Sequence, residues 1–171
     1  MHFELSIFNS LHGLVDLSSL LNWLFIFFAQ YLGYFLIIGF LVILFLEKDW
    51  RQRLYYSSFA VLSVVLSRGI LTETIRFFFD RSRPFVVLNF EPLVSHAVTP
   101  ALPSGHAAFY FALALAVLLI NKKWGLIYLG FASLMGIARV IVGVHWPLDI
   151  LAGALVAIVS FFVVKWLLVR R

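Results

Sequence analysis

The chain has 171 residues, of which 63% are hydrophobic and only 12% are charged. Soluble domains average about half apolar and about a quarter charged residues, so the composition indicates an integral membrane protein and excludes a water-soluble enzyme. Its length has room for one helical bundle, and we expect residues 1–171 to form a single membrane domain. Cysteine is absent, which excludes disulfides and thiolate chemistry. The net charge of +5 does not indicate nucleic-acid binding, because in a membrane protein the placement of charges matters more than their sum.

Residues 1–18 are expected to form an amphipathic helix that lies in the membrane interface. Its apolar residues recur at helical spacing: Ile7, Leu11, Leu14 and Val15. Its polar residues fall on the opposite face: Asn9, His12 and Asp16. A poorly ordered terminus is the alternative.

Five apolar stretches are long enough, or nearly so, to cross a membrane: 23–46, 55–79, 104–120, 124–144 and 147–169. The fifth is free of charged residues only from Ile150 to Val164, which is short of the roughly 20 residues that a span needs. We therefore expect other parts of the protein to surround its polar N-terminal turn. The predicted fold is an all-α, polytopic membrane bundle of about five transmembrane helices with an N-terminal interfacial helix.

Basic residues between the spans predict the orientation. They fall in three places: Lys48, Arg51 and Arg53; Lys122 and Lys123; Lys165, Arg170 and Arg171. With five spans, all three places lie on one side, which the positive-inside rule makes cytoplasmic. The C-terminus is then cytoplasmic, whereas the N-terminus, the loop 80–102 and the junction near His145 face outward.

Five further arginines lie within or beside the spans: Arg68, Arg76, Arg81, Arg83 and Arg139. An arginine in a span costs roughly 2.5 to 3.5 kcal/mol on insertion scales, so it normally has a partner or a function. Internal ion pairs are one explanation, between Glu73 and Arg68 or Arg76, and between Asp80 and Arg81. Two carboxylates do not neutralise five arginines, however, so binding of an external anion is the other explanation.

The first of three polar blocks at the outward ends is RFFFDRSRPF, which contains Arg76 and Arg83. Positions seven apart return to nearly the same face of a helix, and Pro84 disfavours helix at Arg83. We expect the span to end there, with both guanidiniums at one mouth. Their planar, permanently charged forks suit phosphate oxygens.

The second block, PSGH, begins a span. Ser104 is a good N-cap, which leaves Gly105 and His106 in the first helical turn. The unpaired N–H groups and the positive end of the helix dipole make such a turn an anion site. Gly105 lets an oxyanion approach the backbone closely, and His106 is placed to deliver a proton.

The third block, ARVIVGVHWPLD, contains Arg139, His145 and Asp149. Pro147 suits the first position of a new helix, which places Asp149 in its first turn and His145 just outside. A carboxylate that bonds one imidazole nitrogen leaves the other as a nucleophile. Each block alone is weak, since capping PSG turns and polar His–Asp contacts are common, but together on one face they indicate phosphate chemistry.

These three blocks resemble the signature of the type 2 phosphatidic acid phosphatase superfamily, which reads Lys-x6-Arg-Pro, Pro-Ser-Gly-His and Ser-Arg-x5-His-x3-Asp. The matching residues are 76–84, 103–106 and 138–149, in the family's order. Two positions depart from the pattern. Arg76 stands where the family usually has lysine, and Ala138 stands where it has serine.

The resemblance implies a metal-independent phosphatase that uses no cofactor. In the family pattern His145 is the nucleophile that forms a phosphohistidine, Asp149 orients it, and His106 protonates the leaving oxygen. The phosphate-binding residues that it implies are Arg76, Arg83, Ser104, Gly105 and Arg139. Arg81 is expected to pair or to contact a headgroup, and His96 to be a loop histidine, although it could touch the substrate.

An outward-facing site beside lipid favours a lipid phosphate or pyrophosphate as substrate. Small bacterial members of the family with a short N-terminal helix include undecaprenyl pyrophosphate phosphatases of the bacitracin-resistance type. We therefore expect undecaprenyl pyrophosphate to be hydrolysed to undecaprenyl phosphate at the outer face of a bacterial inner membrane. Phosphatidylglycerophosphate, phosphatidic acid and lipid A phosphate are alternative substrates. A lipid phosphotransferase is another reading, and an anion channel or transporter with an arginine ring is the non-enzyme reading. The sequence leaves the oligomeric state and the role of Arg68 open.

Overall fold

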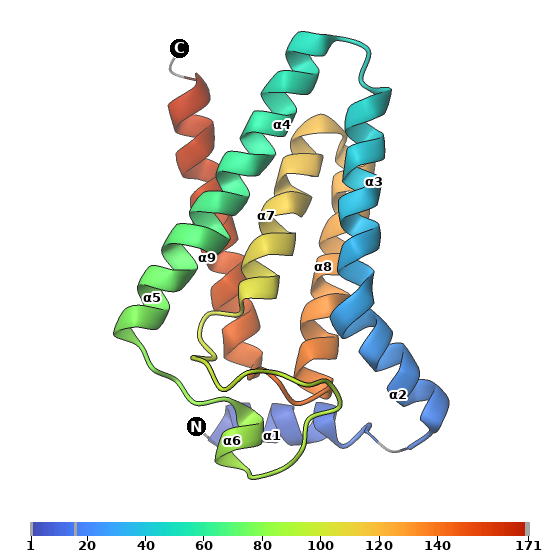
Figure 1. Cartoon of the computed structure of the whole chain (residues 1–171), viewed down its shortest axis with the longest axis vertical. Coiled ribbons are helices and arrows are strands. Elements are labelled where there is room, and N and C mark those ends of the chain that lie inside the picture. The colour runs from blue at the N-terminus through green and yellow to red at the C-terminus, as the bar shows by residue number, and fades with distance from the viewer. Residues whose placement is uncertain (1, 16, 170–171) are drawn as a thin grey trace.

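The computed structural model describes residues 2–15 and 17–169, which form helices and loops without a strand. Long helices stand side by side, and a short N-terminal helix lies across one end of them (Figure 1). In chain order the elements are α1 (His2–His12), α2 (Ser19–Ile26), η1 (Phe27–Tyr31), α3 (Leu32–Leu46), α4 (Trp50–Val64), η2 (Val65–Leu71), α5 (Thr72–Phe78), α6 (Pro84–Val87), α7 (Gly105–Ile120), α8 (Lys122–Ile141) and α9 (Pro147–Val169). The two η segments are π-helical turns within longer helices. The predicted all-α bundle is confirmed, while Asp16, Arg170 and Arg171 lie outside the described residues.

Four helices are long and apolar enough to cross a membrane: Ser19–Leu46, Trp50–Phe78, Lys122–Ile141 and Pro147–Leu168. The first two begin earlier than predicted because side chains cap them, with Ser18 accepting from the N–H of Leu20 and Asp49 from that of Arg51. The remaining apolar helix, α7, has 16 residues. It spans about 24 Å at 1.5 Å per residue, which is less than the roughly 30 Å of a bilayer core. Its N-terminal end stops at Ser104, which is fully buried in the protein.

Helix α7 is the centre of the bundle and packs against α4, α8 and α9 (Figure 1). Many of its buried positions are alanines: Ala107, Ala108, Ala112, Ala114 and Ala116. Small residues let membrane helices approach closely. On the facing helices, a Cβ at Gly125 would overlap the backbone of Leu118, and a Cβ at Gly153 would come within 2.7 Å of the Ser104 carbonyl oxygen. The first contact holds the end of α7 against α8, and the second holds the start of α7 against α9.

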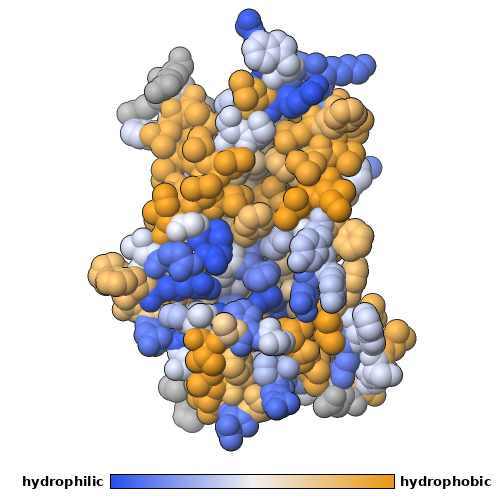
Figure 2. All heavy atoms as spheres, viewed as in Figure 1, coloured by the Kyte–Doolittle hydropathy of each residue, from blue (hydrophilic) through white to orange (hydrophobic). Residues whose placement is uncertain are grey.

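The basic residues predicted to be cytoplasmic lie toward one end of the bundle. The α3–α4 and α7–α8 connections and the C-terminal end of α9 lie opposite α1, α6 and the loop that leads into α7 (Figure 1). The described basic residues at or near the first end are Lys48, Arg51, Arg53, Lys122, Lys123 and Lys165. An apolar belt separates them from the other end on the face seen in Figure 2. Their location on one side of the belt agrees with the prediction, and the assignment of that side to the cytoplasm stays a prediction.

Helix α1 packs onto the other end of the bundle. Phe8 is fully buried, with its ring centroid 5.0 Å from that of Trp146 and 5.2 Å from that of His12. His12 also packs against Phe90 at 4.6 Å, and its Nδ1 donates to the carbonyl oxygen of Ile141 at 2.8 Å. His12, which the helical spacing places on the polar face, thus packs against aromatic rings and donates to the last residue of α8. An interfacial position of α1 in the membrane stays a prediction.

Candidate active site

A cavity of about 440 Å³ opens beside η2, α5, the loop before α7 and the first turns of α7. Its volume falls in the range of about 300–1,000 Å³ that is typical of ligand sites. The lining residues are polar or aromatic, apart from one glycine: Arg68, Glu73, Arg76, Arg83, His96, Thr99, Gly105, His106, Phe109, Tyr110 and His145. Hydrophilic surface gathers below the apolar belt on the face shown in Figure 2. The cavity brings together residues from all three sequence blocks.

The first block reaches the cavity by a different backbone path from the predicted one. α5 ends at Phe78, because Phe79 is extended (φ −128°, ψ 94°) and residues 79–83 are not helical. Arg83 is the N-cap of the next helix, α6, which Pro84 begins. The prediction that one helix carries Arg76 and Arg83 on the same face is therefore wrong. Both guanidiniums nevertheless line the cavity.

Arg76 has a donor with no acceptor in the described part of the chain. Its Nη2 donates to the carbonyl oxygen of Pro103 at 3.1 Å, and its Nη1 lies 3.3 Å from Glu73 Oε1. Its buried Nε has no partner among the described residues. A buried donor without an acceptor costs roughly 1–3 kcal/mol, so an oxygen of a bound anion would relieve this cost.

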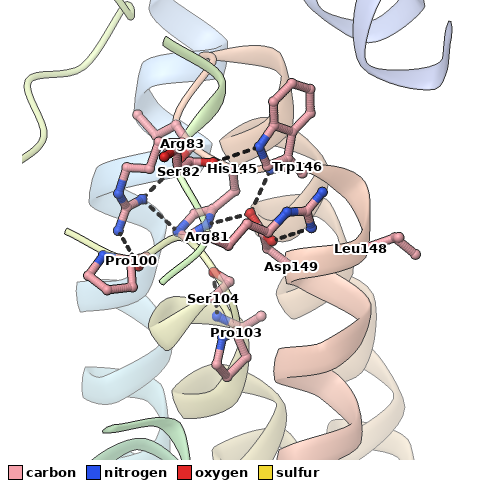
Figure 3. A network of polar contacts seen from close by, with 12 residues as sticks. Arg81, Ser82, Arg83, Pro100, Pro103, Ser104, His145, Trp146, Leu148 and Asp149 are labelled. Atoms are coloured by element: carbon pink, nitrogen blue, oxygen red, sulfur yellow. Dashed lines mark hydrogen bonds and ion pairs between the residues drawn. The ribbon is translucent and has the colours of Figure 1, made fainter. Parts of the chain in front are cut away.

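Arg83 is 1% exposed, and protein acceptors surround its guanidinium (Figure 3). Nε and Nη2 donate to the carbonyl oxygen and hydroxyl of Thr99 at 2.9 and 3.1 Å, and Nη2 also approaches Pro100 O at 3.3 Å. Nη1 donates to Val144 O at 2.8 Å and lies 3.3 Å from His145 Nε2. Burial and the charge of Arg76 lower the pKa of Arg83 to about 10, which keeps it protonated at neutral pH. Arg83 therefore joins the loop before α7 to the histidine.

The second block begins α7 as predicted. Ser104 is the N-cap, its Oγ accepting from the N–H of Ala107 at 3.4 Å and its own N–H donating to the carbonyl oxygen of Asp149 at 2.9 Å. Ser104 is fully buried behind the cavity wall, whereas Gly105 and His106 line the cavity. The structure thus brings Gly105 and His106 to the cavity and uses Ser104 to join α7 to α9.

A glycine turn delivers His145 to the cavity. α8 ends at Ile141, and Gly143 follows with φ +86°, a conformation that glycine adopts readily at helix C-termini. The N–H of Val144 donates back to the carbonyl oxygen of Arg139 at 3.2 Å. The predicted span 124–144 is therefore too long at its C-terminal end, because the chain turns at Gly143.

His145 and Asp149 form a buried pair (Figure 3). His145 Nδ1 lies 3.3 Å from Asp149 Oδ2, and the two side chains are 1% and 0% exposed. Pro147 is the first residue of α9 and Asp149 lies in its first turn, as predicted. The carboxylate is held further by the N–H of Trp146, at 2.8 Å from Oδ2, and by Arg81 Nη1, at 2.8 Å from Oδ1.

The surroundings of His145 determine where its proton lies. Burial lowers the pKa of His145 well below its usual value of 6.5, and the charges of Arg139 and Arg83 lower it further. The ring is therefore neutral at pH 7 and carries one proton. An ionised carboxylate only accepts hydrogen bonds, so the proton belongs on Nδ1, which faces Asp149. Nε2 keeps its lone pair, which faces Arg83 Nη1 at 3.3 Å. A neutral imidazole with such a lone pair is a nucleophile or a base once that contact is displaced.

Arg139 is the second arginine with unused donors. It is 3% exposed, and its Nη1 donates to the carbonyl oxygen of Ala29 at 3.1 Å. Its Nε and Nη2 are buried with no acceptor among the described residues. Arg139 is close enough for its charge to lower the pKa of His145. Its free edge matches the two-oxygen geometry of a phosphate.

Sequence reasoning missed the partners of Arg81. Instead of the predicted pair with Asp80, Arg81 Nη2 pairs with Glu4 Oε2 at 2.6 Å and Nη1 pairs with Asp149. Glu4 also accepts from the N–H of Leu148 at 3.2 Å, which attaches α1 to the start of α9. Glu4 lies 77 positions from Arg81 in the chain, so no local pattern indicates this contact. The other predicted pairing is confirmed, since Glu73 Oε1 contacts the Nη1 atoms of both Arg68 and Arg76.

The structure also assigns positions to residues that no motif contains. The ring of His96 lies 6.2 Å from that of His145, measured between centroids. Burial lowers the pKa of His96 to about 4, which leaves its ring neutral at pH 7. Thr99 and Tyr110 bring hydroxyl groups to the cavity wall. Among the described residues, no group of three or more His, Asp or Glu side chains is arranged as a metal site.

Comparisons with known proteins agree with this arrangement. The model of the PAP2 superfamily matches residues 57–171. The bacitracin transport permease protein BcrC of Bacillus licheniformis is 34% identical over 160 residues, which cover 93% of this chain and 77% of that protein. Undecaprenyl-diphosphatase BcrC of Bacillus subtilis is 30% identical over 164 residues, covering 95% and 81% of the two chains. The crystal structure of Aquifex aeolicus LpxE shares 27% identity with a TM-score of 0.77, covering 94% of this chain and 93% of that one.

The chain forms a membrane-embedded helical bundle and is related to an undecaprenyl-diphosphatase and to LpxE. It is therefore a phosphatase that acts on lipid phosphates. The chain belongs to the PAP2 superfamily, because the family model covers more than half of it and two relatives of at least 30% identity match nearly its whole length. It is therefore an enzyme.

Proposed function

We propose that the protein hydrolyses undecaprenyl diphosphate to undecaprenyl phosphate and orthophosphate, through a phosphohistidine at His145 and on the outer face of the membrane. The observation that carries this proposal is the buried, neutral His145 between Asp149 and the arginines. The similarity to the undecaprenyl-diphosphatase of Bacillus subtilis supports the choice of lipid.

In the first step, His145 Nε2 attacks the terminal phosphorus atom. The N–P bond forms as the bond between that phosphorus and the bridging oxygen breaks. Asp149 stabilises the positive charge that develops on the imidazole, through the Nδ1 contact at 3.3 Å. The unpaired donors of Arg76 and Arg139 bind the equatorial oxygens, on which negative charge spreads. To reach Nε2, the phosphoryl group displaces Arg83 Nη1, which then donates to one of its oxygens.

His106 supplies the proton in the first step and takes one back in the second. The negative charge of bound substrate favours the protonated form of His106, which donates to the oxygen of the departing lipid monophosphate. The neutral ring then accepts a proton from a water molecule whose oxygen attacks the phosphohistidine. Breaking of the N–P bond releases orthophosphate and restores neutral His145.

Phosphate release by the purified protein tests the reaction. Undecaprenyl diphosphate, phosphatidylglycerophosphate, phosphatidic acid and a lipid A phosphate are compared at equal surface concentration with a metal chelator present. We expect undecaprenyl diphosphate to be the best substrate and His145→Asn to reduce its hydrolysis by roughly four orders of magnitude or more, as removal of a nucleophile does elsewhere. Arg51→Gln, at the opposite end of the bundle, is the control and should retain activity.

Five results would count against parts of this proposal. Loss of all activity in chelator would contradict a metal-independent reaction. Activity that persists in His145→Asn would contradict the phosphohistidine, as would a failure to find label from terminally labelled substrate on His145 in wild-type protein quenched during turnover. Transfer of the label mainly to an added alcohol rather than to water would favour a phosphotransferase. A stronger preference for the lipid A phosphate would favour the activity named for lipid A 1-phosphatase of Rhizobium etli, which is 30% identical over 114 residues.

A further inference from the structure

We propose that Arg68 binds the second phosphate of a diphosphate, the one that stays attached to the lipid, and thereby makes the site favour diphosphates over monophosphates. This inference rests on the proposed phosphatase function and goes beyond it, because Arg68 belongs to none of the three sequence blocks. Arg68 lines the same cavity as His145.

A π-helical turn aims Arg68 at the cavity. Arg68 lies in η2, and its ion-pair partner Glu73 follows five positions later in α5. In a regular α-helix, positions five apart point about 140° away from each other. The wider π turn reduces this angle and lets both side chains face the cavity that they line. Single π turns inside α-helices often occur at functional sites.

The side chain of Arg68 lies directly over the first turn of α7. A Cβ at Gly105 would come within 2.5 Å of Arg68 Nε and within 3.0 Å of its Cδ. Because Gly105 is the predicted backbone contact of the transferred phosphoryl group, the guanidinium of Arg68 lies next to that position. The guanidinium is therefore close enough to bind a second phosphate that is bonded to the transferred one.

The arginines around the site differ in how deeply they are buried. Arg83 and Arg139 are 1% and 3% exposed, while the side chains of Arg76 and Arg68 are 13% and 39% exposed. The nucleophile, at 1% exposure, lies with the deep arginines. A diphosphate that places its terminal phosphate at His145 therefore extends its second phosphate toward the mouth of the cavity, where Arg68 lies.

Glu73 explains why a second cation is needed at the mouth. Its Oε1 contacts Nη1 of both Arg68 and Arg76, and it is the one carboxylate among the described residues that line the cavity. A monophosphate needs Arg76, Arg83 and Arg139 alone. A diphosphate carries about one more negative charge than a monophosphate. This charge would lie uncompensated near the Glu73 carboxylate unless Arg68 turned from the carboxylate to the phosphate. The ion pair thus holds Arg68 in position and is weak enough to exchange, because both side chains are exposed.

The test compares two substrates with the same lipid chain, farnesyl diphosphate and farnesyl phosphate, in the full-length protein. We expect Arg68→Gln to lower kcat/KM for the diphosphate by roughly 10- to 100-fold, as expected for the loss of one hydrogen bond to a charged group. The monophosphate should change by less than about threefold, within the range of an exposed ion pair. Arg68→Lys should recover part of the diphosphate activity, since it keeps the charge and loses the fork. Arg51→Gln is the matched control for removal of one arginine from the same long helix.

A purely structural role for Arg68 predicts a different result. Removing the partner of Glu73 would then disturb Arg76, which shares its carboxylate, and would lower kcat/KM for both substrates equally. The proposal would be overturned if Arg68→Gln and Arg68→Lys each lowered kcat/KM by the same factor for the diphosphate and the monophosphate. It would also be overturned if neither variant changed the ratio of the two kcat/KM values. Binding of the two lipids to the His145→Asn variant, with and without Arg68→Gln, separates this inference from the proposed function. A selective loss of diphosphate binding would support Arg68 even if the wild-type protein hydrolysed neither lipid, and equal binding losses would overturn it.

Discussion

At the scale of single residues, Arg81 and Arg139 show two ways of placing a guanidinium in this bundle. Arg81 pairs with two carboxylates, those of Glu4 and Asp149. Arg139 donates to one carbonyl oxygen and leaves Nε and Nη2 buried without acceptors among the described residues. A buried, incompletely paired charge destabilises a fold. Arg81 is therefore suited to holding the structure together, and Arg139 to binding an anion.

Replacing each arginine by methionine should separate these roles. Arg139→Met removes a poorly paired buried charge, so we expect an unchanged or higher Tm in detergent together with a loss of at least roughly 100-fold in kcat, as for other donors to a developing oxyanion. Arg81→Met leaves Asp149 without its ion pair and should lower the free energy of unfolding by about 2–3 kcal/mol. Thermal unfolding and phosphate release measure both effects. A fall in Tm as large for Arg139→Met as for Arg81→Met would contradict the assignment.

The protonation of His145 gives a second prediction at this scale. Its lowered pKa means that the folded protein releases this proton at a lower pH than an unfolded chain does. The unfolded state binds more protons between the two pKa values, so stability should rise with pH through that window and be lost as the pH falls below about 6.5.

Nitrogen NMR of histidine-labelled protein, with His145→Asn for assignment, reports this protonation directly. We expect a neutral ring with the proton on Nδ1 at pH 7 and at pH 6. A ring that titrates at or above pH 6.5, or that carries its proton on Nε2, would contradict the proposed nucleophile.

At the scale of the helices, the sequence predicts well what neighbouring residues determine. Ser104 caps α7 and Pro147 begins α9, as expected, because both signals act within one turn of the chain. The predicted span 55–79 ends within one residue of α5, but the expectation of a helix through Arg83 was wrong, because the spacing of Arg76 and Arg83 does not reveal that Thr99 and Val144 hold Arg83.

Contacts between distant segments were not predictable from a local pattern. Glu4 contacts Arg81 across 77 positions of the chain. The π turn that lets Arg68 face the cavity is a second feature that the sequence pattern did not indicate. The three blocks contain Arg76, Arg83, Gly105, His106 and His145, which line the cavity, whereas Ser104 and Arg139 are not among its lining residues. Packing in the assembled bundle decides which donors are free. The same packing places Ser104 behind the cavity wall.

Glycine substitutions test how the close approach of α7 and α9 positions the site. A Cβ at Gly153 would lie 2.7 Å from both Ala107 Cβ and the Ser104 carbonyl oxygen, whereas a Cβ at Gly130 in α8 would meet nothing within 4 Å. We expect Gly153→Ala to lower stability by about 1–3 kcal/mol and to reduce activity, because it moves Ser104 away from Asp149. Gly130→Ala is the control and should stabilise the helix by up to about 1 kcal/mol. Equal Tm values and full activity in both variants would contradict this role of the contact.

At the scale of the whole molecule, the cavity and the basic residues at or near the opposite end are placed asymmetrically about the apolar belt. Lys48 lies in the α3–α4 connection, Lys122 begins α8 and Lys165 lies in the C-terminal part of α9. These parts of the bundle lie at the end opposite α1 (Figure 1). The cavity lies toward the α1 end, because the loop residues Arg83, His96 and Thr99 and the start of α7 line it. The positive-inside rule then predicts that the cavity opens outward. For a lipid phosphatase, this asymmetry decides which leaflet supplies the substrate.

The absence of cysteine from the sequence makes this orientation directly measurable. Glu91 and Lys123 are exposed and lie in the loop before α7 and at the start of α8, respectively, so Glu91→Cys and Lys123→Cys each introduce a single reactive thiol. We expect a membrane-impermeant maleimide to label Glu91→Cys in intact spheroplasts and Lys123→Cys only after the membrane is opened, because the positive residues beside Lys123 stay in the cytoplasm. Phosphate release by each variant confirms that the labelled protein is folded. The reverse labelling pattern would place the active site in the cytoplasm and would contradict an outer-leaflet substrate, while the chemistry at His145 would stand.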